Sequence, residues 1–214
     1  MLEERDWLTI FGQIGAGWRH DGNPKRPYAR ITSGKITDAY CDCSKLIERP
    51  KLLQLAIEDL IKRCRPHHPP RMDIDVVCGS AFGSIPIATE YARQLDCRAW
   101  FTIKGQSGSR ELDRFHPDGD ERVLLVDDVL TSGGTLERTM SALFEKRVKL
   151  APYIPVIMNR SGLRQLCGMD IVALMEVNDG CEWQEGENPY TPDGRELVEP
   201  VHPRRDWRIL NAHY

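Results

Sequence analysis

The sequence lacks the long apolar run that a membrane-spanning helix needs. None of its 214 residues falls in a stretch that approaches about 18 consecutive apolar positions, so no membrane partner is expected. The first six residues are acidic rather than apolar, and no signal-peptide core follows them. These absences together predict a cytoplasmic protein.

An excess of basic charge is also missing. The 29 Lys and Arg residues are outnumbered by 32 Asp and Glu residues, and the formal net charge is −3. The short basic clusters at 146–149 and 204–205 are typical of solvated surface. A nucleic acid is therefore not an expected partner, because phosphate contacts need clustered cations.

The cysteine and glycine patterns contain neither a disulfide or zinc-binding arrangement nor a triphosphate-binding motif. The seven cysteines are odd in number and scattered, which favours a reducing compartment over a disulfide scaffold. Cys41 and Cys43 lack a second Cys/His pair at zinc-finger spacing, so no direct protein metal site is expected. The Gly-Lys-Ser/Thr sequence of a Walker A loop is missing, which argues against hydrolysis of a nucleoside triphosphate.

The most informative segment that is present runs from residue 123 to residue 135. Four apolar residues precede the adjacent carboxylates Asp127 and Asp128, and a run of hydroxyl and glycine residues follows. Apolar residues then recur at helical spacing from Leu136 to Phe144. This order predicts a buried strand, a loop whose amides hold an anion at a helix N-terminus, and carboxylates suited to sugar hydroxyls. A ribose 5-phosphate compound combines those two features.

This segment resembles the phosphoribosyl pyrophosphate (PRPP) signature of type I phosphoribosyltransferases at all thirteen positions. The resemblance implies that Asp127 and Asp128 bind the ribose hydroxyls. It also implies that the following loop cradles the 5-phosphate through Thr131, Ser132, Gly133, Gly134 and Thr135. An ordinary strand–turn–helix is the alternative, but adjacent acids at a buried strand end are costly unless a ligand uses them.

The rest of the chain alternates between strand and helix patterns. Strands are expected near 75–78, 99–103, 123–126, 153–158 and 170–175, with helices near 52–64 and 87–95. A helix is also expected within 3–17, and a short antiparallel pair of 29–31 with 40–43. Residues 104–121 are polar and aperiodic, which is typical of a functional or mobile loop.

The alternation predicts an α/β fold: a parallel sheet with helices on both faces, plus a small N-terminal hood. We expect three parts: an N-terminal helix and hood segment (1–45), a PRPP-binding core (46–177) and a C-terminal extension (178–214). The sequence leaves open whether the extension packs on the core or on a partner. Ligands of such sheets bind at the carboxyl ends of the strands.

Three further motifs resemble those of orotate phosphoribosyltransferases, in the same order over about residues 28–176. Residues 32–40 are similar to the hood segment over the base, and residues 79–88 to the pyrophosphate loop and its helix. Asn159 and Arg160 fall where the family has an arginine near the orotate carboxylate. The resemblance implies pyrophosphate contacts from Ser80, Ala81, Phe82 and Gly83, and base contacts from Lys35, Tyr40 and Arg160. A core-edge aromatic and solvated cations are the alternative for those last three residues.

The chain departs from that pattern where the family carries cations. Thr32 and Gly83 stand where the family has lysines, and residues 102–110 replace a loop rich in Lys, Arg and His. Lys104 and Arg110 remain as candidate catalytic cations beside Asp127 and Asp128. Losing one preorganised contact to the leaving group costs about 3–4 kcal/mol.

The resemblance implies Mg²⁺ carried on PRPP oxygens, a nucleobase acceptor that is most simply orotate, and a homodimer. The 104–121 loop would close over the site to exclude water. Two alternatives stay open: transfer to another base, including a purine, and a PRPP-sensing regulator that has lost turnover.

Overall fold

The structure, a computed structural model, describes residues 1–31, 33–70, 72–177 and 180–213. These residues form two compact units. Unit 1 comprises residues 1–7 and 46–177, and unit 2 comprises residues 8–45 and 180–213. The division falls inside helix α1 (Glu4–Gln13) and inside the short helix α2 (Ser44–Ile47). Each unit is described by itself.

Unit 1 is built on a sheet whose central strands are parallel. In the described part of the chain, the strand order is β11-β12-β10-β8-β5-β6-β7, and β9 pairs with β8. The long strands are β5 (Val76–Ser80), β6 (Arg98–Lys104), β8 (Arg122–Leu130), β10 (Tyr153–Asn159) and β12 (Met169–Glu176). The short ones are β7 (Arg110–Glu111), β9 (Lys149–Leu150) and β11 (Gln165–Leu166). β7 and β11 are antiparallel to their neighbours.

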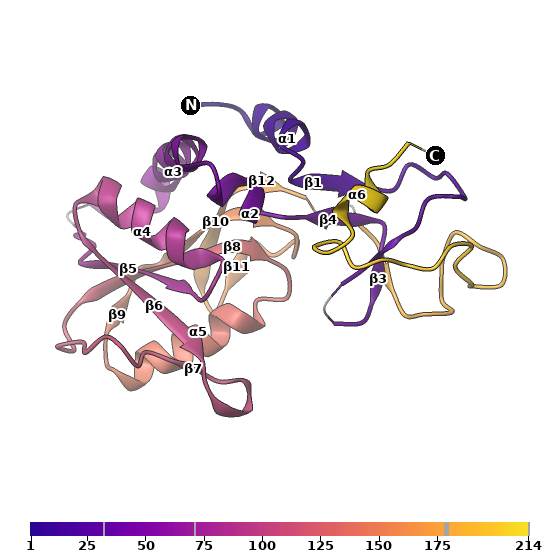
Figure 1. Cartoon of the computed structure of the whole chain (residues 1–214). Helices are drawn as coiled ribbons and strands as arrows, with labels where there is room; N and C mark the ends of the chain where they lie inside the picture. Colours follow the sequence, from indigo (N-terminus) through magenta and orange to yellow (C-terminus); the bar gives the residue numbers. More distant parts are fainter. Residues whose placement is uncertain (32, 71, 178–179, 214) are drawn as a thin grey trace. The chain divides into compact units, whose positions relative to one another are not determined.

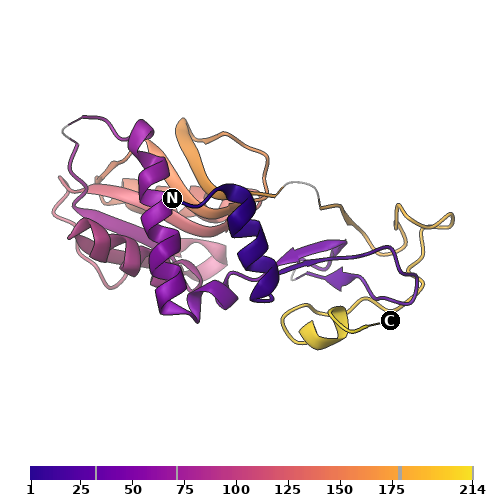
Figure 2. The ribbon, with the colours of Figure 1, turned by 90° about the horizontal axis from the view of Figure 1, so that it is seen from above.

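Helices cover both faces of this sheet, which confirms the expected α/β architecture. Helices α3 (Pro50–Cys64) and α4 (Ser84–Leu95) pack together on one face, and α5 (Gly134–Glu145) lies on the other (Figure 1). Figure 2 shows α3 from above, lying across the strands. Pro50 occupies the first turn of α3, where a missing backbone N–H costs nothing. Two 3-10 turns, η1 (Arg65–His67) and η2 (Gln106–Gly108), complete the unit.

The core of unit 1 follows from the apolar character of its strands and helix faces. β5 and β10 are buried along their whole lengths, as expected for parallel strands covered on both sides. Leu136, Met140 and Leu143 bring α5 into the same cluster. Phe144, which the helical spacing placed on this stripe, is instead 59% exposed, because it lies beyond the edge of the buried face.

The segment 104–121, expected as a functional or mobile loop, contains a short strand and packs partly against the core. β7 pairs with β6 in a hairpin. Leu112 is buried, and the Phe115 ring stacks on Trp100 at 6.0 Å. The buried Glu121 carboxylate accepts the amides of 118 and 119 at 3.1 and 3.0 Å. Two apolar anchors and one carboxylate thus order a stretch whose polar composition suggested a loop.

Unit 2 contains two small antiparallel sheets. Strand β1 (Gly17–Arg19) pairs with β4 (Ala39–Cys41), and β3 (Ile36–Thr37) lies between β2 (Ala29–Arg30) and β13 (Glu182–Trp183). The expected pairing of 29–31 with 40–43 is therefore wrong. Gly34, with a φ of 88°, closes a tight turn in which the Ile31 amide donates to the Lys35 carbonyl, so β2 meets β3 first.

The C-terminal segment belongs to unit 2 together with the N-terminal one. β13 pairs with β3, Ala29 forms a parallel bridge with Val201, and the Trp18 indole donates to the Leu210 carbonyl at 2.9 Å. Helix α6 (Trp207–Leu210) adds Leu210 to a cluster with Trp18 and Ala29. Chain segments more than 140 residues apart thus build one unit.

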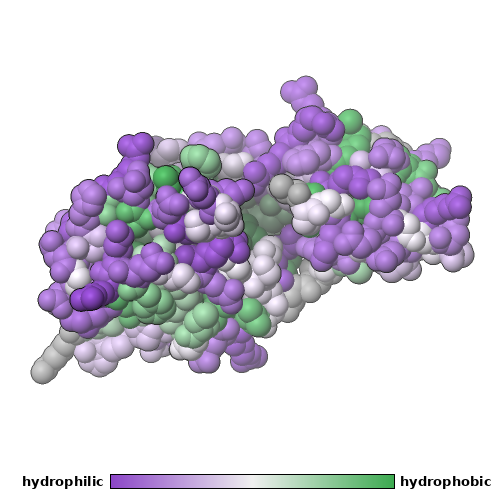
Figure 3. Space-filling view, turned by 90° about the horizontal axis from the view of Figure 1, so that it is seen from below, coloured by the Kyte–Doolittle hydropathy of each residue, from purple (hydrophilic) through white to green (hydrophobic). Residues whose placement is uncertain are grey.

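The face of the molecule drawn in Figure 3 is mainly hydrophilic. Figure 3 shows one face, on which apolar residues lie in separate small patches among hydrophilic ones. Among the described residues, no helix combines the length and the apolar character that crossing a bilayer requires.

Candidate functional site

Two carboxylates lie at the carboxyl end of β8, in the middle of the unit 1 sheet. Asp127 is 6% exposed, and its Oδ1 accepts a hydrogen bond from the Ser84 hydroxyl at 2.5 Å. Asp128 Oδ1 accepts the Val129 amide at 2.9 Å. The parallel neighbours β5 and β10 end at the same edge of the sheet. The carboxylates therefore stand where open α/β sheets bind their ligands.

Asp127 lies in an environment that disfavours its ionised form. Burial, and then the charge of Asp128, raise the pKa of Asp127 to about 7, and hydrogen bonding from Ser84 opposes the shift. An ionised Asp127 therefore lacks the solvation that water would supply. A ligand that donates hydroxyl hydrogen bonds or brings positive charge to this edge stabilises the ionised form.

The loop after β8 presents backbone amides at the start of α5. Thr131 and Ser132 are exposed, and Gly134 and Thr135 are partly so. Gly133 has a φ of 82°, a backbone conformation that favours glycine, and a Cβ there would crowd the end of the Leu166 side chain at 2.8 Å. The first-turn amides of a helix have no intrahelical acceptor. They and the helix dipole suit this loop to a phosphate.

The loop after β5 lies beside the carboxylates. The Ala81–Phe82 peptide is cis, and the Phe82 side chain is 87% exposed. A Cβ on Gly83 would clash with Asp128 Oδ2, so these two loops approach closely. The Ser80 hydroxyl lies 2.9 Å from Thr139 Oγ1 of α5. All four residues of the expected pyrophosphate loop thus border the edge that carries Asp127 and Asp128.

A cation reaches this edge from the β6–β7 hairpin. Arg110 Nη1 donates to the Ala81 carbonyl at 3.1 Å. Burial lowers the pKa of Arg110, and the nearby charge of Asp127 opposes that shift. Lys104 faces Arg110 in the hairpin register and is exposed. The structure therefore brings Arg110 to the carboxylates and leaves Lys104 at the neighbouring strand end.

Arg138 is a second cation at this site, and the sequence analysis missed it. Its Nη1 would lie 3.2 Å from a Cβ on Gly134, and its charge lowers the pKa of Arg110. Helical side chains lean toward the N-terminus, so a residue one turn after Gly134 covers the phosphate loop. The i, i+4 spacing from Gly134 is the signal that would have found it.

The three expected base-binding residues are divided between the units. Arg160 follows β10 in unit 1, and its amide donates to the Leu130 carbonyl at 2.8 Å. In unit 2, Lys35 Nζ lies 3.6 Å from Glu182 Oε2, and the Tyr40 hydroxyl accepts from Arg204 Nε at 3.2 Å. Both unit 2 side chains therefore have partners within their own unit. Thr32, where the family has a lysine, lies outside the described residues.

Within the described ranges, no cluster of three or more His, Cys, Asp or Glu side chains is arranged to hold a metal ion. The hard oxygen ligands nearest the phosphate loop are Asp127 and Asp128, and Mg²⁺ prefers such donors together with phosphate oxygens. These residues fit a magnesium ion that a phosphorylated ligand brings with it.

A family profile described as phosphoribosyl transferase domain matches residues 45–165, which include both loops and both carboxylates. The chain belongs to the phosphoribosyltransferase family. The resemblance drawn from its signature is thereby confirmed, and so is the fold expected from it.

Curated members of the family extend the similarity along most of the chain. An orotate phosphoribosyltransferase of Pelotomaculum thermopropionicum is 34% identical over 189 residues, covering 88% of this chain and 95% of that protein. An orotate phosphoribosyltransferase of Caldicellulosiruptor saccharolyticus is 30% identical over 171 residues, covering 79% of this chain and 85% of that protein.

Solved structures of the family share the fold. The crystal structure of orotate phosphoribosyltransferase from Aeropyrum pernix has a TM-score of 0.63 at 21% identity, covering 79% of this chain and 92% of that one. Adenine phosphoribosyltransferase from Rhodothermus marinus has a TM-score of 0.55 at 20% identity, covering 81% and 99%. Enzymes named for a pyrimidine and for a purine thus share this architecture, so the fold does not select the base.

Proposed function

We propose that the protein transfers the phosphoribosyl group of PRPP to orotate, forming orotidine 5-phosphate and pyrophosphate. The proposed PRPP site rests on one observation: paired carboxylates and a phosphate loop lie together at the end of β8. The choice of orotate is supported by relatives of that name that align along most of the chain.

In this proposal the β8 edge binds the ribose 5-phosphate half of PRPP. The 5-phosphate accepts hydrogen bonds from the amides and hydroxyls of residues 131–135, and the ribose hydroxyls donate to Asp127 and Asp128. Those hydroxyls replace the water that burial removes from Asp127, which offsets the rise in its pKa. Binding therefore favours the ionised carboxylate.

Arg110 and Arg138 meet the charge of the pyrophosphate leaving group. The family's loop lysines are absent here, and these two guanidinium groups lie near Asp127 and Gly134. Arg110 also donates to the Ala81 carbonyl, which holds it against the pyrophosphate loop. Cleavage of the C1–O bond develops negative charge on pyrophosphate, and preorganised cations stabilise that charge. Lys104 is the third candidate cation.

Mg²⁺ is the proposed cofactor, carried on PRPP oxygens beside Asp127 and Asp128. When bound, it neutralises part of the pyrophosphate charge. The protein residues act by holding the ribose and phosphate and by excluding water, since hydrolysis of PRPP is the competing reaction.

For the base, Arg160 is the candidate in unit 1 that meets the orotate carboxylate. Lys35 and Tyr40 remain predictions from the family resemblance. A cytoplasmic homodimer is the proposed working form, again from that resemblance.

The test is a panel of orotate, uracil, adenine, hypoxanthine and guanine with PRPP and Mg²⁺, following pyrophosphate release. Release with orotate alone supports the proposal. If pyrophosphate is released only with another base, that base is the acceptor and the choice of orotate is wrong. PRPP binding without turnover on any base contradicts transfer and favours the PRPP-sensing regulator, which the missing lysines would explain. Omitting the base controls for hydrolysis of PRPP.

A further inference from the structure

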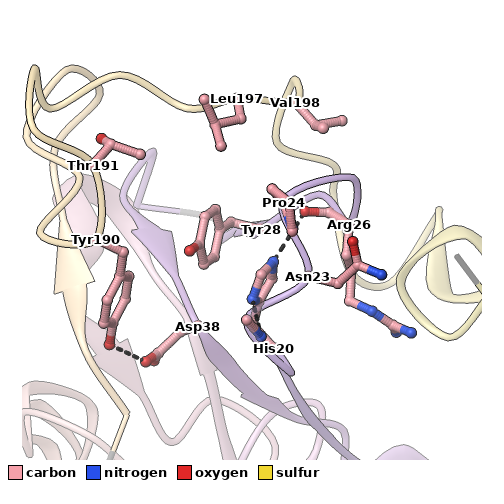
Figure 4. A pocket seen from close by; sticks show the side chains of 11 residues that line it. His20, Asn23, Pro24, Arg26, Tyr28, Asp38, Tyr190, Thr191, Leu197 and Val198 are labelled. Atoms are coloured by element: carbon pink, nitrogen blue, oxygen red, sulfur yellow. Dashed lines mark hydrogen bonds between the residues drawn. The ribbon is translucent and has the colours of Figure 1, made fainter.

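Unit 2 contains a cavity that the proposed transfer reaction does not use. It has a volume of ≈ 500 Å³ and lies between residues 20–38 and residues 190–198 (Figure 4). This volume falls in the range of small-molecule sites. None of the lining residues belongs to the PRPP loop, the pyrophosphate loop or the β6–β7 hairpin.

Aromatic rings with fixed orientations form one wall. His20 stacks on Tyr28 with ring centroids 4.0 Å apart, and Tyr28 is nearly parallel to Tyr190, at 6.1 Å and 13°. In Figure 4, Tyr28 lies between the other two rings. The buried Trp183 packs edge-on against both tyrosines, at 5.0 and 5.8 Å. These contacts fix the orientation of the exposed Tyr190 ring, on which a flat ligand can stack.

The same cavity leaves large apolar side chains in water. Tyr190 is 57% exposed and Leu197 is 67% exposed, and both line it. Pro24 and Val198 add apolar surface beside them. Covering such side chains recovers roughly 25 cal/mol for each Å² removed from water. Exposed apolar surface that gathers in a hollow is typical of a ligand site.

Asp38 provides a polar group in this apolar wall. One of its oxygens accepts the Tyr190 hydroxyl at 2.6 Å, and the other accepts the Cys181 amide at 2.7 Å. An ionised carboxylate offers about four acceptor positions and no donor, so it has room for a further hydrogen bond from a ligand N–H.

The other polar side chains of the cavity are engaged within the protein. Both His20 nitrogens have backbone partners, at Gly22 and Arg26. The Arg26 guanidinium lies 3.2 Å from Asp21 and donates to the carbonyls of Leu210 and Ala212. The available charge is therefore the negative charge of Asp38, which disfavours an anionic ligand.

We propose that this cavity binds a flat nitrogen heterocycle of nucleoside size that carries an amino group. The ring stacks on the exposed Tyr190 ring, which Tyr28 supports from the other side, and the amino group donates to Asp38. The lining residues all belong to unit 2, and none belongs to the β8 edge, so the full chain is expected to bind such a molecule without PRPP.

The test uses isothermal titration calorimetry of the full chain with adenosine, in the absence of PRPP. Adenosine has no phosphate for the β8 loop, and purine riboside is the same molecule without the amino group. Adenosine is expected to bind about tenfold more tightly than purine riboside. Tyr190→Ala is expected to weaken adenosine binding about tenfold or more. Asp38→Asn is expected to remove the preference for the amino group.

Phe144→Ala is the matched control, because Phe144 is 59% exposed, like Tyr190, but lies in unit 1. It should leave adenosine binding unchanged. Retained PRPP binding and an unchanged melting curve check that each variant folds. No measurable adenosine binding to the unaltered chain, or affinity that Tyr190→Ala leaves unchanged, overturns the proposal. Equal affinity for adenosine and purine riboside overturns the role of Asp38.

Discussion

Unit 1 and unit 2 differ in how many separate stretches of the chain they contain. Apart from its first seven residues, unit 1 is one continuous stretch in which strands and helices alternate, and its chemistry lies at strand ends. Unit 2 combines two stretches from opposite ends of the chain, with strands of two or three residues and a wall of aromatic rings. The fold of unit 1 can therefore be predicted from local sequence patterns, whereas the fold of unit 2 depends on contacts between segments far apart in the sequence.

The largest expected effect tests the chemistry of unit 1 alone. Replacing both Asp127 and Asp128 with Ala should weaken PRPP binding by at least about 100-fold. Two charge-assisted hydrogen bonds, worth about 1.5–3 kcal/mol each, are lost. Calorimetry with PRPP and Mg²⁺ measures the loss. Unchanged affinity would contradict the site assignment, and an unchanged melting curve is the control for folding.

Unit 2 is tested through Trp183, which is 5% exposed and donates from its indole to Glu196 at 2.8 Å. Trp183→Ala should destabilise unit 2 by about 3–5 kcal/mol, because a large buried ring is removed. Hydrogen exchange should then increase in β2, β3 and the tail while β5 and β8 stay protected. Equal loss of protection in both units would show that they unfold together.

The next prediction tests whether Arg138 stabilises the pyrophosphate leaving group in place of the lysines that this chain lacks. Arg138→Ala should lower kcat/KM for PRPP by about 100-fold, which corresponds to about 3 kcal/mol of leaving-group stabilisation. Arg110→Ala should act in the same direction. Arg114→Ala is the matched control, because Arg114 is an exposed arginine of the 104–121 segment. Steady-state pyrophosphate release measures all three, and full activity of Arg138→Ala would rule out its role.

The smallest effect is a pH dependence that follows from Asp127. Its pKa is raised to about 7, above the ordinary value of 3.8, so the folded state disfavours the ionised carboxylate. The resulting penalty is absent below about pH 4, grows as pH rises, and is complete above pH 7. Asp127→Asn removes it and should raise the Tm at pH 8 by a few degrees, with little change at pH 4. A larger gain at pH 4 than at pH 8 would contradict the assignment.

The site of unit 1 was predictable because its residues are consecutive. Asp127, Asp128 and the following loop are a strand end and a helix start, and each follows from local spacing. Arg138 was missed because its position over the loop depends on the direction in which helical side chains lean. The hairpin of 104–111 was missed because Leu112 and Phe115 act through distant core contacts.

By itself, the sequence determined the parallel sheet, its helices and the place of the acidic pair and the glycine-rich loop after a buried strand, because hydrophobic periodicity and loop chemistry are local properties. Only the tertiary structure decided that the two ends of the chain form one unit. It also decided that β2 pairs with β3 and that Tyr28 faces Tyr190 beside Asp38. Those contacts join residues far apart in the sequence, and strands of two residues carry too little periodicity to specify their partners.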